Sequence, residues 1–386
     1  MRFPNPVLSR LALPLALSLL VSAPAFADAE RLESDLRALV AKHGELSIGD
    51  LSTSLLGGET RAEDLRFESL DGEILLIERY VVEGDYEHPD TVTLEGIRVE
   101  GIELEDAPQE LEVDLLLSIG SIVVEAPGSA VPPLDDETLA EEWLDVMTLT
   151  ELSLEHPEGM LASLASLDLD GDFEEGQGGL ALEALAVDLD RLITLSPEEE
   201  RTRLRMASNV LTDGSGQLHL DAGFDARWEP EDEQTGRLFS DGELTLRDAL
   251  VMAIDLESLL ALPEGAEVAT LLADGTLLEE AALGGGQFEL RLTERGLFAR
   301  LATLGATMEG ISKAQYLEQA RTQAEGFGMM FGPQVRDLLN GLVDLMAGGA
   351  EELVVTFDLP AEERLEGFAE DPLALPERFA MQVETR

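Results

Sequence analysis

The sequence lacks cysteine altogether and has almost no lysine. Without cysteine in its 386 residues the chain forms no disulfide, and it has no thiolate to bind a metal or attack a substrate. Lysine occurs only at Lys42 and Lys313, so nearly all 25 basic residues are arginine. Aromatic residues make up 5% of the chain, which disfavours the aromatic platforms of sugar-binding sites. Stability must therefore come from side-chain burial and backbone pairing.

Catalytic motifs are missing as well. The sequence has no G-x-S-x-G elbow, no phosphate-binding loop and no dinucleotide-binding glycine fingerprint. The histidines, His43, His88, His156 and His219, lie far apart and match no metal-binding or hydrolase spacing, so we expect them on the surface. The sequence thus predicts no catalytic, cofactor-binding or metal-ligating residue, and it favours a protein that is not an enzyme.

Acidic residues dominate the composition. The chain has 80 Asp and Glu against 25 Lys and Arg, a formal net charge of -55. So negative a chain disfavours binding to nucleic acid and to anionic membrane surfaces, which both need a positive footprint. Like charges repel one another in the folded state, and salt screens this repulsion. We interpret the acidity as adaptation to a salty medium, and a surface that binds a cationic partner or metal ions is the alternative.

One acidic triplet is similar to the ligand pattern of a calcium-binding loop. Asp168, Asp170 and Asp172 alternate as ligands do in an EF-hand, but such a loop needs glycine at its sixth position. Here Gly171 stands at the fourth position, and the surrounding residues alternate between apolar and polar. A strand is the favoured interpretation, and calcium binding is the alternative.

The first 27 residues have the pattern of an export signal. Arg2 and Arg10 are followed by the apolar run Leu11–Val21, and an Ala-x-Ala cleavage pattern ends at Ala27. The apolar run is too short to span a bilayer, although an uncleaved anchor is the alternative. We expect a mature chain that begins at Asp28, with no later transmembrane segment. The expected location is the periplasm, with secretion as the alternative.

Hydrophobic periodicity predicts an α+β fold. Asp28 to His43 should be helical, because leucines recur at three- and four-residue steps before Gly44. Apolar and polar residues alternate through most of the chain after Gly44, most clearly in Gln217–Glu229, as in half-buried antiparallel strands. Helical periodicity returns at Ser312–Ala324, with Ser312 as N-cap, and at Val335–Met346. We expect an elongated, curved, mostly antiparallel sheet with an N-terminal helix and a C-terminal helical hairpin.

The domain organisation is inferred from the same periodicity. Residues 1–27 are the expected signal, residues 28–310 a β-rich region, and residues 311–386 a helical hairpin with closing strands in the same domain. Within the β-rich region, Asp241-Gly242 should form a turn inside the stretch Leu238–Leu246. Leu256–Leu262 should be helical, and Gly296–Phe298 should belong to a strand.

An unusual apolar segment, Gly326–Gly332, lies where the two C-terminal helices should meet. It places the apolar side chains Phe327, Met329, Met330 and Phe331 among glycines. Methionine adapts to varied surfaces, so these four residues are the candidate patch for contact with lipid or a protein partner. The alternative is a tight turn whose apolar side chains pack on the sheet.

The region from Gly58 to Leu104 resembles the first β-repeats of AsmA-like envelope proteins. The resemblance rests on the strand Leu65–Phe67, the turn Asp71-Gly72, the apolar strand Ile74–Ile77 and the further strands with glycines where the alternation shifts. It implies a long curved antiparallel sheet with an apolar groove and a role in moving lipid between membranes. The C-terminal part resembles exported β-rich families in general.

These observations predict a non-enzymatic periplasmic protein that binds an apolar or lipid ligand through a curved sheet. The alternative is a structural or interaction module of the cell envelope without a small ligand, whose partner is an envelope protein. A hydrolase without a recognisable motif is the third hypothesis. No cofactor and no nucleic acid are expected.

Overall fold

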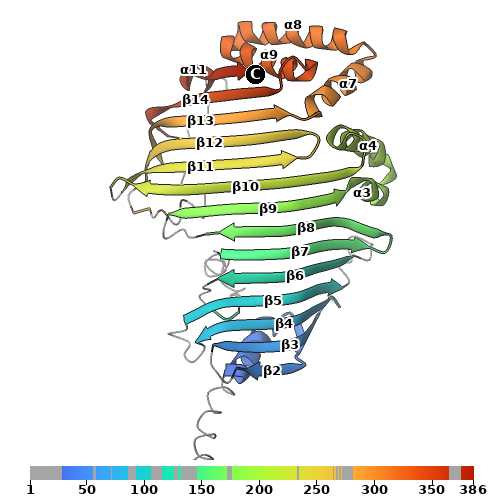
Figure 1. The fold of residues 1–386 in the computed structure, drawn as a ribbon, viewed down its shortest axis with the longest axis vertical. Coiled ribbons are helices and arrows are strands. Elements are labelled where there is room, and N and C mark those ends of the chain that lie inside the picture. The colour runs from blue at the N-terminus through green and yellow to red at the C-terminus, as the bar shows by residue number, and fades with distance from the viewer. Residues whose placement is uncertain are drawn as a thin grey trace, which may run out of the picture. The chain divides into compact units, whose positions relative to one another are not determined.

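Figure 1 shows the computed structural model of the chain. It describes residues 28–54, 58–70, 72–85, 93–105, 115–125, 129–131, 146–171, 176–232, 234–263, 265–266, 268, 271, 281–364 and 375–386. The expected export signal, residues 1–27, lies outside these ranges. The chain divides into two compact units, residues 1–160 and 161–386, and each is described by itself.

The first unit is a helix followed by an antiparallel meander. The helix spans residues 28–40. β3 pairs with β1, β2 and β4, and each later strand pairs with the next. Leu32 and Leu36 of the helix are buried with residues of the first strands, among them Leu65, Val82 and Ile97. The strands are β1 (Gly44–Ser47), β2 (Asp50–Thr53), β3 (Glu59–Ser69), β4 (Ile74–Asp85), β5 (Thr93–Glu105), β6 (Leu116–Glu125) and β7 (Val146–His156).

The second unit is a longer meander with helices at its connections. From β8 onward each strand pairs antiparallel with the next. The strands are β8 (Gly159–Asp170), β9 (Gln177–Asp188), β10 (Gln217–Pro230), β11 (Thr235–Leu246), β12 (Leu250–Ala261), β13 (Ala282–Glu294), β14 (Glu352–Arg364) and β15 (Gln382–Thr385). Helices α3 (Leu189–Leu195) and α4 (Glu198–Thr212) connect β9 to β10, helices α7 (Leu297–Glu309), α8 (Lys313–Phe331) and α9 (Pro333–Ala347) connect β13 to β14, and α11 (Leu375–Arg378) precedes β15.

The fold class predicted from the sequence is confirmed. The protein is α+β, its strands are mostly antiparallel, and helices stand at the N-terminal end and before the last long strand. Ser312 is the N-cap of α8, and its hydroxyl accepts a hydrogen bond from the backbone N–H of Gln315. The side-chain oxygen of Gln315 accepts in turn from the backbone N–H of Ser312, which completes a capping box. α8 and α9 pack against each other as the expected hairpin. In the part of the chain that the structure describes, no helix is both long and apolar enough to span a bilayer.

Two local predictions on the strands β11 and β12 are wrong. Asp241-Gly242 is not a turn but lies inside β11, which pairs with β10 and β12 along its length. A Cβ at Gly242 would crowd the side chains of Ile254 and Phe224, so this glycine permits close packing on the apolar face. Leu256–Leu262 is not helical, since most of it belongs to β12. A short apolar run does not distinguish a buried helix from a strand, and here the pairing with β11 and β13 decides.

The expected strand at Gly296–Phe298 is also wrong, because α7 begins there. Gly296 has a φ of 129°, which ends the extended backbone of β13. The carboxylate of Glu294 then accepts hydrogen bonds from the backbone N–H groups of Phe298 and Ala299, at 3.0 and 3.1 Å. These two bonds satisfy free donors in the first turn of α7 and fix where the helix starts.

Candidate functional site

The two faces of the sheet in the second unit differ in chemistry. Successive side chains of a strand point to opposite faces. In β10, Asp225 therefore projects from one face and Phe224 from the other, and in β12 Asp255 and Ile254 do the same. Each face carries a hollow, and these two hollows are the candidate sites.

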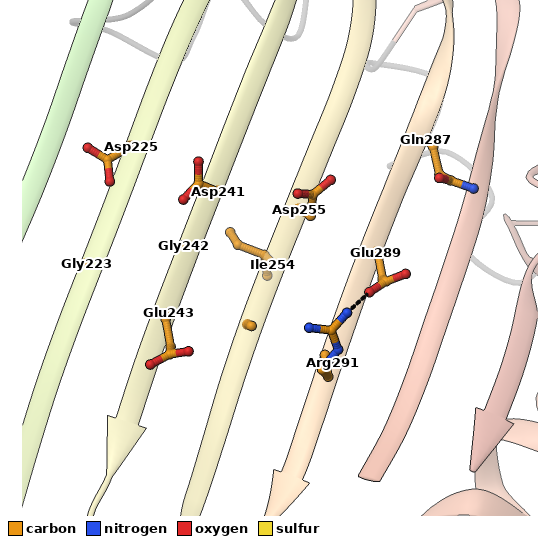
Figure 2. A pocket seen from close by; sticks show the side chains of 11 residues that line it. Gly223, Asp225, Asp241, Gly242, Glu243, Ile254, Asp255, Gln287, Glu289 and Arg291 are labelled. Carbon is orange, nitrogen blue, oxygen red and sulfur yellow. Dashed lines mark hydrogen bonds and ion pairs between the residues drawn. The ribbon is translucent and has the colours of Figure 1, made fainter. Parts of the chain in front are cut away.

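The hollow on the polar face measures about 540 Å³ and lies over β10 to β13. Four carboxylates stand directly opposite one another in adjacent strands. Asp225 is opposite Asp241, Asp241 is opposite Asp255, and Asp255 is opposite Glu289 (Figure 2). We call these four residues the acidic row. Among the described residues that line this hollow, Arg291 is the one basic side chain, and it donates to Glu289 at 2.5 Å.

The acidic row is a source of repulsion and not a preformed ion site. Like charges directly opposite each other in antiparallel strands destabilise the pair. Within the described ranges, no group of three or more His, Asp or Glu side chains is placed to hold a metal ion. Dissolved cations can therefore weaken the repulsion among these four carboxylates by screening their charge.

The hollow on the apolar face measures about 350 Å³ and lies over β11 to β14, next to α11. Among the described residues that line it, the one polar side chain is that of Ser258, which donates within the sheet to the carbonyls of Leu259 and Gly285, at 3.5 and 3.4 Å. A guest in this hollow would thus meet hydrocarbon. The lining residues are Leu238, Leu256, Ser258, Leu260, Leu283, Phe288, Phe357, Leu359, Leu375 and Phe379.

A glycine triplet in β13, Gly284–Gly286, shapes the apolar hollow. The register of β13 shifts at this point against both β12 and β14. The shift changes which side chains face the hollow: Phe288 and Leu283 both line it, although residues an odd number of positions apart lie on opposite faces of a regular strand. A Cβ at Gly286 would collide with the carbonyl oxygen of Glu257, so the bulge requires glycine there.

The apolar face continues beyond the hollow. Leu180 of β9 lies directly opposite Phe224 of β10, and both side chains are about two-fifths exposed, at 40% and 41%. Leu244, Met252 and Ile254 of β11 and β12 are half-buried on the same face. The hollow is thus the deepest part of a longer apolar strip.

The four residues of the candidate patch, Phe327, Met329, Met330 and Phe331, lie in the last turns of α8 and not in a turn between helices. Phe327 and Phe331 are four residues apart and stack, with ring centroids 6.0 Å apart and planes at 20°. Phe327, Met329 and Met330 are exposed, and Phe331 is half-buried. The structure brings the two rings together and leaves both methionines facing outward.

The remaining candidates of the sequence analysis lie apart. His43 is exposed, His156 and His219 are half-buried in separate strands, and His88 lies outside the described residues. Asp168 and Asp170 belong to β8, as the strand interpretation predicts, and Asp172 lies outside the described residues.

Sequence reasoning identified the residues of neither hollow. The alternation of apolar and polar residues in β10 predicts that its two faces differ. The acidic row, however, can be recognised only when the register of four strands is known, and the pattern of a single strand does not contain that register. The apolar hollow was missed because the apolar run Leu256–Leu262 predicts a helix. The triplet Gly284–Gly286 was the available signal, since glycine inside a strand often marks a bulge.

The sequence matches no protein-family model, and no curated protein matches it significantly. The resemblance to AsmA-like proteins therefore stays a prediction.

Proposed function

We propose that this chain is a non-enzymatic periplasmic protein that binds the acyl chain of a lipid on the apolar face of its second unit. The observation that carries the proposal is the apolar hollow of about 350 Å³, which falls within the range of small-molecule sites. Because Ser258 is already bonded within the sheet, the hollow offers nothing to a polar guest. The buried part of the ligand is hydrocarbon, and its polar end stays in water.

The apolar strip supports the same proposal. Leu180 and Phe224 extend apolar surface from the hollow across β9 and β10, which a long unbranched chain can follow. Burial of apolar surface would supply the affinity, at roughly 25 cal/mol per Å² before the costs of association. Recognition by shape alone implies that acyl chains of similar length compete with one another.

Lipid extraction tests the proposal. Protein purified from its host, beginning at Asp28, is extracted and analysed by mass spectrometry. We expect lipid to co-purify reproducibly and Leu256→Trp, which fills the hollow, to reduce it several-fold. Met252→Trp is the matched control, because Met252 lies on the same face of β12 but does not line the hollow.

Two outcomes would overturn the ligand proposal. If extracts contain no lipid above the level of an unrelated exported protein, the envelope interaction module without a small ligand becomes the better proposal. Equal loss of lipid in Leu256→Trp and Met252→Trp would show that the hollow itself is not the site. N-terminal sequencing tests the expected cleavage separately, and Met1 retained in the soluble fraction would contradict a mature chain that begins at Asp28.

A further inference from the structure

The apolar hollow is closed toward the C-terminal ends of β10 and β12. Trp228 of β10 is 6% exposed and packs in one cluster with Leu238 and Leu260, which both line the hollow. Leu262 and Leu271, which follow β12 in the sequence, are buried in the same cluster. A guest in the hollow therefore meets packed side chains in this direction and cannot extend along the strands.

Two helices close the hollow on the side of β14. Leu375 of α11 and Phe379, which directly follows α11, line the hollow, and Phe379 is buried. The backbone N–H of Asp358 in β14 donates to the carbonyl oxygen of Phe379 at 2.8 Å, which holds this wall against the sheet. Further along β14, α9 covers the same face, because its Leu345 is buried in one cluster with Val355. The hollow therefore has no exit toward β14.

The apolar face stays exposed on the side toward β9. Ile254 follows the hollow-lining Leu256 on the same face of β12. A Cβ at Gly242 would lie 3.2 Å from side-chain atoms of both Ile254 and Phe224, so these two side chains meet over the glycine. Leu180 lies opposite Phe224 in the next strand. The apolar strip therefore runs without interruption from the hollow to β9, which lies about 14 Å from β12 at the usual strand spacing.

We propose that the ligand binds tail first: the methyl end of one acyl chain fills the hollow, the chain crosses β12, β11 and β10, and its polar end lies in water at β9. This inference rests on the proposed function and adds the direction of the chain. A polar end inside the closed hollow would lose its hydrogen bonds to water, whereas a methyl end has none to lose. The ligand is therefore an amphiphile whose acyl chain carries its polar group at one end alone, as a fatty acid does.

Bromine atoms on the ligand test the direction, because they quench a tryptophan that they contact. The probes are palmitate brominated next to its methyl end and palmitate brominated next to its carboxylate. In the chain beginning at Asp28 with Trp143→Phe, the buried Trp228 is the reporter beside the hollow. We expect the first probe to quench Trp228 and the second to leave its emission nearly unchanged. With Leu180→Trp added, the second probe should quench the new, exposed tryptophan, whose emission lies at longer wavelength.

Binding of unlabelled acids tests the path of the chain. Phe224→Ser should weaken the binding of palmitate several-fold and that of decanoate less, because the shorter chain makes fewer contacts beyond the hollow. Met206→Ser is the matched control, since Met206 is also exposed, at 40%, but belongs to α4. It should bind palmitate as the unsubstituted chain does. Hexadecanedioate, with a carboxylate at both ends, should bind about tenfold more weakly than palmitate or worse, because one charged end would enter the hollow.

The outcomes separate this inference from the proposed function. If palmitate binds but the two brominated probes quench Trp228 equally, or the carboxylate-end probe quenches it more, the direction is wrong and the acyl-chain site stands. Hexadecanedioate bound as tightly as palmitate would also overturn the direction alone. Equal palmitate binding by Phe224→Ser and Met206→Ser would show that the chain does not cross β10. If neither palmitate nor decanoate binds, the proposed function and this inference both fail.

Discussion

One row of charges in the first unit and one in the second cross their strands in opposite ways. In the first unit, Arg79 of β4 stands between Glu63 of β3 and Glu100 of β5, so neighbouring strands present opposite charges. In the second unit, the acidic row Asp225, Asp241, Asp255 and Glu289 presents the same charge on four strands. Both rows belong to antiparallel meanders, so the backbone does not account for the difference.

The row in the first unit belongs to a connected network of ion pairs. Arg79 forms a short contact with Glu100, and its Nε lies 3.6 Å from Glu63. The network extends through Arg61, which lies 3.9 Å from Glu63, and through Arg98, which lies 3.8 Å from Glu100. The charge of Glu100, and less strongly those of Glu63 and Glu78, raises the pKa of Arg79 above its ordinary value.

The comparison of the two rows shows what an arginine between acidic residues changes in a very acidic chain. Where an arginine stands between two glutamates, the acidic residues contribute to pairing between strands. Where none does, the same residues repel one another and depend on dissolved salt. Salt should therefore act more on the strands of the acidic row, β10 to β13, than on β3 to β5.

The largest expected effect is that of salt on the second unit. Its melting temperature should rise by several degrees between dilute buffer and molar NaCl, because the Debye length falls from about 30 Å at 0.01 M to about 3 Å at 1 M. The chain has two tryptophans, Trp143 and Trp228. Replacing Trp143 by Phe leaves the buried Trp228 as a fluorescent reporter of this unit.

Molar KCl should have nearly the same effect if screening is the cause. Hydrogen exchange of β3 to β5 should change less over the same range than that of β10 to β13. An unchanged melting temperature from dilute buffer to molar NaCl would refute the salt interpretation. A response to millimolar calcium alone would instead support specific cation binding.

The next effect is that of reversing one charge in the acidic row. Asp241→Arg places an arginine between Asp225 and Asp255 and gives the second unit the alternation of the first. It replaces two like-charge pairs by two opposite-charge pairs, each worth roughly 0.2–1 kcal/mol, so the free energy of unfolding should rise by about 1–2 kcal/mol in dilute buffer. Urea unfolding followed by Trp228 fluorescence measures this, and a decrease would contradict the repulsion assigned to the row.

Arg79→Gln should have the opposite effect in the first unit. It leaves Glu63, Glu78 and Glu100 without their shared partner, and the Nε of Arg79 is itself buried. The first unit should unfold at lower temperature. The control is Arg66→Gln, which removes the exposed pair of Arg66 and Glu68, at 2.8 Å, and should have little effect. Equal losses in the two variants would show that the network is worth no more than an isolated surface pair.

The sequence was sufficient to predict the strands whose two faces differ in polarity. β10 alternates regularly and was predicted almost to its ends, and α9 was predicted from its apolar side chains at helical spacing. The capping of α8 by Ser312 was also predicted, because capping depends on neighbouring residues alone.

The predictions that failed concern elements whose structure is decided by contacts between residues far apart in the sequence. The Asp-Gly pair of β11 is a strong local turn signal, but pairing with strands on both sides holds Gly242 extended. α3 and α4 were not expected, because the alternation of apolar and polar residues in β9 continues up to Asp188. A local signal was present, since Asp188 caps α3 by accepting a hydrogen bond from the backbone N–H of Arg191. The candidate sites depend on register and on the bulge at Gly284–Gly286, which single strands do not encode.

The smallest expected effect is that of removing one charge from the acidic row. Asp241→Asn keeps the shape of the side chain and abolishes two like-charge pairs, so the free energy of unfolding should rise by about 1 kcal/mol or less in dilute buffer. In molar NaCl the gain should vanish, because screening has already removed the repulsion. Glu229→Gln is the control, since Glu229 contacts Arg227 on the same face of β10 and lies outside the row, and it should not stabilise at either salt concentration. A gain for Asp241→Asn that persists in molar NaCl would mean that packing, and not charge, explains it, and the contrast between the two units would then no longer account for the response to salt.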